Sequence, residues 1–225
     1  MNNKKVIYIL IILIFCIGIY LCVPQIINFI STKKEIQSAL TLADEIDIKQ
    51  NDKLYNLMVQ YNTNLAQGSQ KLFSSENVYK EPDFLLKDNG IDNCEILGKI
   101  YIPKINIQLA LYNGAKEEYM KKGAVCWGNT SLPIGGENTN SVISAHNRFY
   151  GNNMFIDIDK LEIGDDIYIQ NFWNTLHYQV IDFKIIRNDD FSYSYVEQGK
   201  SIITLMTCYK YPNRDRRYVV IAEQK

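Results

Sequence analysis

Residues Ser201–Arg217 read SIITLMTCYKYPNRDRR and pass from an apolar run into a polar loop. Isoleucine, leucine and methionine mixed with threonine up to Thr207 are the composition of a β-strand. Proline, asparagine and charge after Cys208 predict a loop. The apolar run Tyr218–Ala222 predicts a returning strand, so the segment is predicted to be strand, loop, strand with Cys208 at the end of the first strand.

Cys208 has two interpretations. A cysteine at the end of a strand can be held rigidly and still face a groove, and arginines beyond the loop can fold back toward it. A fixed positive charge near a thiol favours the thiolate, which is the reactive species. The structural alternative is a small buried apolar residue, the most common role of a free cysteine.

The chain has two histidines as candidate bases, His146 and His177. His177 lies in TLHYQV, where the alternation places it on the polar face of a strand. His146 ends the apolar run SVISAH and precedes loop residues, so it too is predicted at a strand end. A nucleophile and a base that are distant in sequence can meet in space when their strands are neighbours.

Several segments resemble one family in the same order along the chain. The segment TLMTC resembles the TLxTC signature of sortases, the membrane-tethered cysteine transpeptidases of Gram-positive bacteria. The other similar blocks are Gly98–Gly114 (GKIYIPKINIQLALYNG), Ser131–His146 (with SLPIGG and NSVISAH), Met154–Ile169 (MFIDIDKLEIGDDIYI) and an arginine followed by an apolar strand. This resemblance implies a mainly β fold, the eight-stranded sortase barrel with short helices, over residues 98–225.

The residue pattern alone favours the same class of fold. Short alternating segments separated by turn signals predict an antiparallel barrel or sandwich. Helical turns are predicted at Glu117–Lys122 and Asn153–Leu161. A length of 225 residues suits one domain with additional segments, and a net charge of −1 gives no reason to expect a nucleic-acid partner. The segments with strand character are Ile100–Ile102, Ile107–Leu111, DIYIQ, LHYQVIDF, IITLMT and YVVIA.

The N-terminus predicts a membrane anchor. Lys4 and Lys5 precede the apolar run Val6–Val23, which is long enough to span a bilayer. The run is apolar all round, unlike a one-faced soluble helix. A cleaved signal peptide is the alternative, but no small-x-small cleavage site follows the run. Lys33 and Lys34 reduce the charge asymmetry, so the extracellular position of the catalytic domain rests on the resemblance.

These observations divide the chain into five parts. We expect a cytoplasmic tail at 1–5, a single-pass anchor at 6–30, a helical segment at 31–67, an irregular lid-like segment at 68–97 and a catalytic barrel at 98–225. Thr32 and Glu35 fit a capping box at a helix start. The apolar spacing from Leu54 to Leu65 predicts a helix that stops at Gly68 and packs on the domain.

The irregular segment contains Glu81-Pro82-Asp83-Phe84. The preceding YNTNLAQG resembles class C sortases, the pilus-associated kind, in which this region carries a lid with an Asp-Pro-aromatic motif. Here Glu81 precedes the proline, Asp83 follows it, and Phe84 comes one place later than in that motif. A carboxylate of this turn could pair with the catalytic arginine while Phe84 shields the thiol; a solvated surface turn is the alternative.

Cysteine spacing predicts no metal or cofactor. Cys16 and Cys22 lie in the membrane run, and the spacing contains no CxxC pair of the zinc-binding type. Cys94 and Cys126 could form a disulfide in an oxidising exterior, but sequence does not establish the required geometry.

The resemblance implies a mechanism. The Cys208 thiolate would attack the threonine carbonyl of an LPXTG-like sorting signal, and His146 would protonate the departing amine and deprotonate the incoming one. An arginine would hold the peptide and stabilise the oxyanion. Arg214, Arg216 and Arg217 compete for this role. Matching the family's Arg-apolar-apolar strand onto RYVVIA selects Arg217.

Three acceptors for the acyl group remain open. A pilin lysine would build a pilus, a cell-wall precursor peptide amine would anchor surface proteins, and water would make a peptidase. The lid-like segment favours the pilin lysine, although class C enzymes often carry a second membrane segment that does not follow Glu223-Gln-Lys. The expected partners are pilin or surface proteins bearing the sorting signal, the amine acceptor, and the membrane through the N-terminal helix.

Two other classes of protein are alternatives to this interpretation. A papain-like protease would use the same pair of residues, but CYKYP lacks the local signature of that family, whose nucleophile lies early on a helix. A tethered binding domain with a degenerate site is the remaining alternative, and the combination of Cys208, His146 and an arginine after the loop argues against it.

Overall fold

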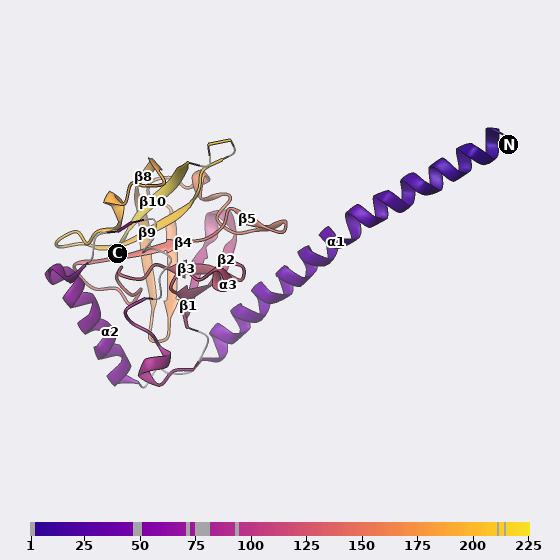
Figure 1. The fold of residues 1–225 in the computed structure, drawn as a ribbon. Helices are drawn as coiled ribbons and strands as arrows, with labels where there is room; N and C mark the ends of the chain where they lie inside the picture. The colour runs from indigo at the N-terminus through magenta and orange to yellow at the C-terminus, as the bar shows by residue number, and fades with distance from the viewer. Residues whose placement is uncertain are drawn as a thin grey trace.

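The computed structural model describes residues 3–46, 51–70, 73–74, 82–92, 95–210, 212–213 and 215–225 (Figure 1). The α-helices are α1 (Asn3–Glu45), α2 (Asp52–Asn64) and α3 (Glu117–Met120), with one π-helical turn, η1 (Leu65–Ser69). The 3-10 turns are η2 (Lys87–Asn89), η3 (Pro103–Ile105), η4 (Ile158–Lys160) and η5 (Ser192–Ser194). The strands are β1 (Ile96–Ile102), β2 (Ile107–Asn113), β3 (Ala124–Cys126), β4 (Thr139–Ser144), β5 (Arg148–Phe149), β6 (Asn152–Asn153), β7 (Asp166–Asn171), β8 (Thr175–Arg187), β9 (Ser201–Cys208) and β10 (Arg216–Gln224).

Eight of the strands close into a barrel in the order β1-β2-β3-β4-β9-β10-β8-β7, while β5 and β6 form a separate hairpin. The mainly β fold and the eight-stranded barrel are therefore confirmed. Most neighbours are antiparallel, but β2 pairs with β3 and β4 pairs with β9 in parallel. The β4–β9 pair brings together two segments about sixty residues apart in the sequence, and both C-terminal ends point to the same end of the barrel.

Strand alternation produces two apolar layers. Inward residues of all eight strands form an inner cluster, which α2 joins through Leu54 and Met58. Outward residues on one side of the barrel form an outer cluster beneath α1 and α3. The inner cluster includes Ile100, Ile102, Leu109, Leu111, Ile143, Ile167, Ile169, Ile203, Leu205 and Val220. The outer cluster includes Ala39, Tyr112, Tyr119, Val125, Trp127, Val142, Tyr193, Ile202, Met206, Val219 and Ile221.

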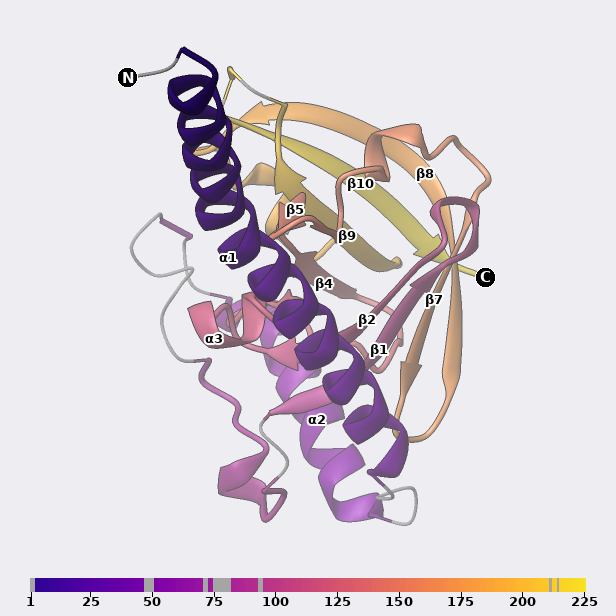
Figure 2. The ribbon, with the colours of Figure 1, turned by 90° about the vertical axis from the view of Figure 1, so that its right-hand side faces the viewer.

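α1 is one continuous helix that passes from a projecting apolar half onto the barrel (Figure 2). Its N-terminal half extends away from the domain and contains Pro24. Within the described residues it is the one helix long and apolar enough to cross a membrane, and its most apolar window is entirely unburied. Its C-terminal half crosses β1 and β2 in Figure 2, buries Ala39 and pairs Asp44 with Lys99 of β1.

The capping box predicted at Thr32 is wrong. The helix does not begin there, because α1 runs without a break from Asn3 to Glu45. A capping side chain is needed only where backbone N–H groups lack partners, and here the preceding turn supplies them. Thr32 is instead buried where the helix meets the barrel.

The helical stretch formed by α2 and η1 stops at Gly68, as the sequence predicted. The Asn51 side chain accepts a hydrogen bond from the Leu54 N–H at 3.0 Å and caps its start. Gly68 has a φ of 97°, a conformation that favours glycine and terminates the helical turn. Asn62 fixes the helix to the barrel by donating to the Leu132 carbonyl at 3.0 Å and accepting from the Leu132 N–H at 2.7 Å.

Candidate active site

The parallel pairing of β4 and β9 brings Cys208 and His146 together. The last paired residues of these strands are Ser144 and Met206. Continuing this register by two residues places His146 opposite Cys208, and neighbouring strands lie about 4.8 Å apart. Sequence analysis predicted both residues at strand ends and left open whether the two strands are neighbours.

Hydrogen bonds continue the contact beyond the last strand pair. The Thr207 hydroxyl lies 2.9 Å from the Ala145 carbonyl oxygen and 2.7 Å from Asn147 Oδ1. The Asn147 amide donates to the Cys208 carbonyl at 2.7 Å. Both chain neighbours of His146 are thus bonded to the end of β9. Asn147 was not among the residues singled out from the sequence, although its position directly after the histidine was a usable signal.

Arg217 lies on the other side of Cys208. β10 pairs antiparallel with β9, and Arg217 is directly opposite Cys208 in the register. Paired residues of neighbouring strands share a face of the sheet. Arg217 also shares its face with Val219 and Ile221 of the outer cluster, as its strand phase predicted. Arg216 points to the other face and is exposed, while Arg214 lies outside the described residues.

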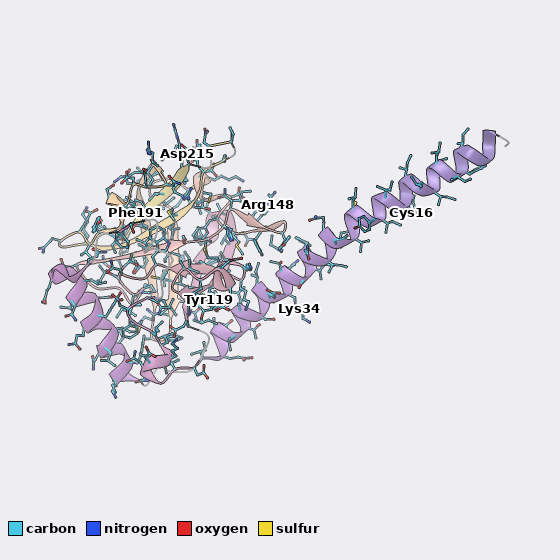
Figure 3. The ribbon with its side chains drawn as sticks, in the orientation of Figure 1. Cys16, Lys34, Tyr119, Arg148, Phe191 and Asp215 are labelled. Atoms are coloured by element: carbon cyan, nitrogen blue, oxygen red, sulfur yellow. The ribbon has the colours of Figure 1, made fainter. Side chains whose placement is uncertain are left out.

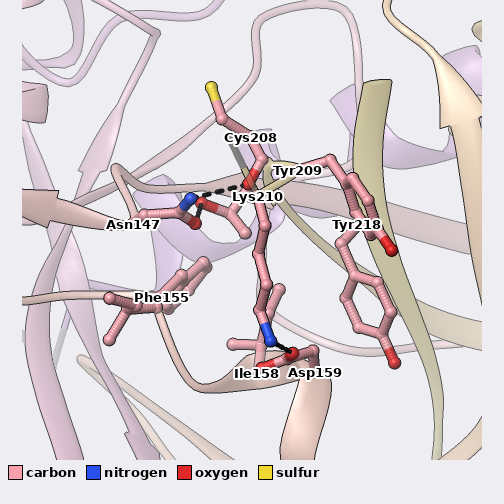
Figure 4. Close-up of a pocket in the computed structure, with 10 residues that line it drawn as sticks. Asn147, Phe155, Ile158, Asp159, Cys208, Tyr209, Lys210 and Tyr218 are labelled. Atoms are coloured by element: carbon pink, nitrogen blue, oxygen red, sulfur yellow. Dashed lines mark hydrogen bonds and ion pairs between the residues drawn. The ribbon is translucent and has the colours of Figure 1, made fainter. Parts of the chain in front are cut away.

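Cys208 is therefore the middle residue of three adjacent strand ends. Its thiol is free and exposed. An imidazole follows the strand on one side, and a guanidinium lies on the strand on the other side. Figure 4 shows the sulfur pointing away from the side chains of the neighbouring cavity. The same outward direction is expected from the alternation of β9, because Met206, two residues earlier, belongs to the outer cluster.

The surroundings of His146 lower the pKa of its imidazole. Partial burial lowers the pKa of His146 below its usual value, the nearby Glu117 carboxylate opposes this shift, and the Lys121 ammonium adds to it. Glu117 and Lys121 pair at 2.6 Å on α3. The imidazole stacks on the ring of Phe149 with centroids 5.4 Å apart and planes at 12°. Neither Glu117 nor Lys121 was identified from the sequence. Their spacing of four residues was the available signal.

A cavity of about 260 Å³ lies beside Cys208 on the inner side of β9 (Figure 4). Lys210 crosses it and forms an ion pair with Asp159. The remaining lining is mainly apolar or aromatic and comes from the loop after His146, from η4 and from β10. The lining residues are Asn147, Phe155, Ile156, Ile158, Asp159, Thr207, Cys208, Tyr209, Lys210 and Tyr218.

Aromatic rings cover the outer face of β4 and β9. The Trp127 indole donates to the Ser144 hydroxyl at 2.8 Å, and the Tyr193 hydroxyl contacts the Met206 sulfur at 3.0 Å. Phe73, from the predicted lid-like segment, lies over this layer. Its ring centroid is 6.3 Å from Trp127, 6.2 Å from Phe191 and 5.4 Å from Tyr195.

The structure does not place Asp83 and Phe84 at this site. Phe84 packs against Tyr61 of α2 at 5.5 Å, and its carbonyl accepts from the Asn113 amide at 2.7 Å. Pro82 is buried so close to Gly114 and Gly128 that a Cβ at either glycine would lie 2.7 Å and 2.9 Å from it.

This position is at the other end of the barrel. β3 runs antiparallel to β4, so Gly128, beyond the end of β3, lies toward the beginning of β4. His146 follows the end of β4. None of the described residues of 82–92 lines the cavity beside Cys208. The expectation that Asp83 and Phe84 cover the thiol is corrected accordingly, while Glu81 lies outside the described residues.

The other candidate residues have structural roles. Cys126 is a free, buried thiol whose pKa burial raises to about 12, and its sulfur donates to the Ser131 carbonyl at 3.5 Å. The suggested disulfide is thus not formed at Cys126, and Cys94 lies outside the described residues. His177 pairs with Asp166 at 2.7 Å on the β7–β8 surface. Among the described residues, no group of three or more His, Cys, Asp or Glu side chains could hold a metal ion.

A free, exposed thiol at the end of β9, with Arg217 opposite it on β10 and His146 after the neighbouring β4, has the groups that cysteine acyl transfer requires. Residues 100–225, more than half of the chain, match the Sortase domain family. The chain belongs to the sortase family and is a sortase cysteine transpeptidase.

The solved structures that it resembles are class C sortases. Sortase C of Clostridium perfringens SM101 is 33% identical with a TM-score of 0.68, covering 84% of this chain and 97% of that one. Sortase C1 of GBS pilus island 1 is 28% identical with a TM-score of 0.71, covering 86% and 91%. Among curated relatives, Sortase A of Bacillus anthracis is 28% identical over 145 residues, which are 64% of this chain and 67% of the relative.

Proposed function

We propose that this sortase cleaves an LPXTG-like sorting signal through a Cys208 thioester and transfers the acyl group to the lysine of a pilin. The observation that supports the proposal is the strand register: β10 pairs Arg217 with Cys208 of β9, and His146 follows two residues after the end of β4, which pairs in parallel with β9. No other histidine lies near Cys208, because His177 is paired with Asp166 on β7.

The first half-reaction forms the thioester. The neutral His146 imidazole takes the proton of the Cys208 thiol and becomes the imidazolium. The resulting thiolate attacks the threonine carbonyl carbon of the sorting signal, and the negative charge moves to the carbonyl oxygen. Arg217, a permanent cation beside Cys208, stabilises this oxyanion. The C–N bond then breaks, the His146 imidazolium gives its proton to the departing amine, and the acyl group remains on sulfur.

The second half-reaction releases the product. A neutral amine attacks the thioester carbonyl, the C–S bond breaks, and the neutral His146 takes the proton from the attacking nitrogen. The thiolate is regenerated and an amide forms. The lowered pKa of His146 suits the base of this second step, because the imidazole is largely deprotonated at neutral pH.

The substrate class is supported by the structural neighbours. One solved structure is of Clostridium perfringens sortase C with the C-terminal cell wall sorting motif, and another neighbour comes from a pilus island. The origin of that neighbour in a pilus island supports a pilin lysine as the acceptor. We further propose that α1 anchors the enzyme in the cell membrane as a single span, with the barrel on the extracellular side. The unburied apolar window of α1 supports the anchor.

The test uses the full chain in lipid nanodiscs. A peptide containing the sorting signal is mixed with a lysine-containing pilin fragment, with a cell-wall peptide amine, or with no amine. The products are then separated by mass. The expected result is an amide to the pilin lysine. An adduct formed only with the cell-wall amine would identify an anchoring sortase, and cleavage to the acid alone would identify a peptidase.

Matched variants test the three side chains. Cys208→Ala, His146→Ala and Arg217→Ala are each expected to lower the rate by at least about a hundredfold, because each removes a nucleophile, a proton carrier or a charge stabiliser. The controls are His177→Gln and Arg216→Gln, which change the same residue types outside the site and are expected to retain activity. An equal loss of activity in Arg216→Gln and Arg217→Ala would contradict the assignment of Arg217 as the residue that stabilises the oxyanion.

A further inference from the structure

The hairpin that follows His146 is built against the helix that enters the membrane. β5 and β6 pair Arg148 with Asn153 and Phe149 with Asn152. The Asn152 amide donates to the Phe29 carbonyl of α1 at 3.1 Å. Gly151 faces the Phe29 ring so closely that a Cβ there would lie 3.1 Å from it. The hairpin and α1 are therefore in direct contact at Phe29.

The level of this contact relative to a bilayer follows from helix geometry. The apolar run Val6–Val23 is about 27 Å long at the helical rise, close to the thickness of the hydrocarbon core. Phe29 is six residues further on, about 9 Å beyond the end of this run, which is about 7–8 Å beyond the edge of the hydrocarbon core when the run is centred in a core about 30 Å thick. The headgroup layer on each side adds about 5–8 Å to the core. Phe29 and the hairpin packed against it thus lie at the level of the headgroups.

The apolar surface of α1 continues to the same level. Ile26, Ile27 and Ile30 are each more than half exposed, and Phe29 is 39% exposed. The first basic residues after them, Lys33 and Lys34, are exposed one turn later. The change from exposed apolar to exposed basic residues marks the lipid–water boundary along the helix.

The tip of the hairpin has the side chains of an interfacial segment. Tyr150 is 50% exposed, although its ring also contacts Phe149 at 4.7 Å. It adopts a φ of 43°, which is unfavourable for a bulky side chain, and the following Gly151 has a φ of 79°. An exposed tyrosine in a costly conformation points to a role outside the barrel. Arg148 is also exposed, and Figure 3 shows it on the side of the barrel from which α1 projects.

We propose that the β5–β6 hairpin docks on the headgroup layer of the bilayer that α1 spans. Tyr150 lies at the interface, where tyrosine is enriched because its ring is apolar and its hydroxyl polar. Arg148 binds lipid phosphates through its guanidinium. Because the His146 imidazole stacks on Phe149 of the same hairpin, docking holds the catalytic histidine close to the membrane surface.

This inference rests on the proposed membrane anchor, so the test separates the two. The full-length Tyr150→Trp variant is reconstituted into vesicles of phosphatidylcholine and phosphatidylglycerol, with or without bromine near the top of the acyl chains. Co-flotation with the vesicles reports the anchor. Tryptophan quenching by the brominated lipid reports the hairpin.

The matched control is Tyr101→Trp on β1. Tyr101 is 42% exposed, but it lies two residues from Lys99, whose partner Asp44 is fifteen residues further along α1 than Phe29. That is about 22 Å from the proposed interface. The native Trp127 is buried and Trp173 is half-buried. The emission of the wild-type chain is therefore the background for both tryptophan variants.

The added emission at position 150 is expected to fall by about half in brominated vesicles, since a ring at the headgroup level lies within reach of the bromines. The emission at position 101 should not change. Arg148→Trp places the same probe on the hairpin without the positive φ and should be quenched in the same way. Co-flotation without quenching of either hairpin probe would overturn the docking alone, and loss of co-flotation would overturn the anchor and the docking together.

Discussion

Two opposite charges act on His146, those of Glu117 in α3 and of Lys121 directly after this helix. Glu117 favours the protonated imidazole, and Lys121 disfavours it. Since the two side chains also neutralise each other at 2.6 Å, their combined effect on the histidine is small, and partial burial determines the direction of the shift. The pKa of the histidine can therefore be changed by a substitution on α3 that leaves the barrel intact.

We expect Glu117→Gln to lower the pKa of His146 further. The substitution removes the charge that favours imidazolium and leaves Lys121 without its counter-charge. Lys121→Gln should raise the pKa by the same reasoning. The measurement is an NMR titration of the imidazole protons, in which the chain contributes only two histidines and His146→Ala identifies the resonance. The acidic limb of the pH–rate profile should move in the same direction as the pKa.

The control is Glu118→Gln, one residue further along the same helix. Glu118 lines a separate cavity with Lys34 and Lys122, on the side of α3 that faces α1. The His146 titration should be unchanged in this variant. A rise in the pKa of His146 in Glu117→Gln would show that burial of the imidazole had changed, and would contradict the electrostatic account.

At the residue level, the sequence pattern predicted which face of a strand a side chain lies on. It did not predict which strands are neighbours. Strand alternation placed Arg217 on the face of Val219 and Ile221, and placed His177 on an exposed surface. It could not show that β4 lies beside β9, because pairing of distant strands depends on the whole barrel. The family resemblance implied an eight-stranded barrel but did not name these two strands as neighbours. Asn147 was missed because a loop asparagine has many possible hydrogen-bond partners.

At the level of elements, the segment 68–97 reaches the barrel at two places. Phe73 lies on the aromatic layer over β4 and β9, whereas Phe84 packs against α2 at the opposite end. The resemblance assigned the covering aromatic to Phe84 because it is next to the proline. Contacts between distant segments, which no local motif encodes, place Phe73 and not Phe84 on the aromatic layer over the outer face.

Alanine substitutions should distinguish these two places. Phe73→Ala is expected to speed cleavage of a sorting peptide by up to about tenfold, because about 1.4 kcal/mol of packing over the outer face is lost and local opening becomes easier. Phe84→Ala is expected to leave the rate unchanged and to lower the free energy of unfolding by about 1–2 kcal/mol, less than for a fully buried ring.

Both rates are measured with the same peptide and with the full chain in nanodiscs, and stability is followed by denaturant unfolding. Acceleration by Phe84→Ala with no effect of Phe73→Ala would show that the turn at Asp83 and Phe84 controls access to Cys208 after all. Loss of activity in both variants would instead indicate that the aromatic layer supports the site.

At the scale of the whole molecule, α1 runs from its exposed apolar N-terminal half onto the barrel as one continuous helix, so the proposed anchor has no flexible linker to the barrel. The helix touches the barrel at Phe29, near the active-site hairpin, and again at Asp44, on β1. Two contacts well separated along one rigid helix fix the orientation of the barrel. The sequence indicated the anchor and the helical segment separately, but the capping box at Thr32 suggested a break that the continuous helix does not have.

The ion pair between Asp44 of α1 and Lys99 of β1 tests whether the C-terminal half of α1 contributes to the stability of the fold. The Lys99 side chain is 8% exposed, whereas Asp44 is 57% exposed. Asp44→Asn leaves a nearly buried ammonium without its counter-charge, so we expect the free energy of unfolding to fall by about 1–3 kcal/mol. The matched control is Asp157→Asn, which breaks an exposed pair with Lys160 and should change stability by less than about 0.5 kcal/mol.

The double variant Asp44→Asn with Lys99→Met separates the charge from the packing. Methionine keeps much of the lysine stem and removes the buried ammonium, so stability should return toward that of the wild type if the unpaired charge causes the loss. Denaturant unfolding of the full chain in detergent micelles, monitored by far-ultraviolet circular dichroism, gives all four free energies. If Asp44→Asn and Asp157→Asn are equally mild, the C-terminal half of α1 does not contribute to the stability of the barrel, and a rigid connection from the membrane to the active site is contradicted.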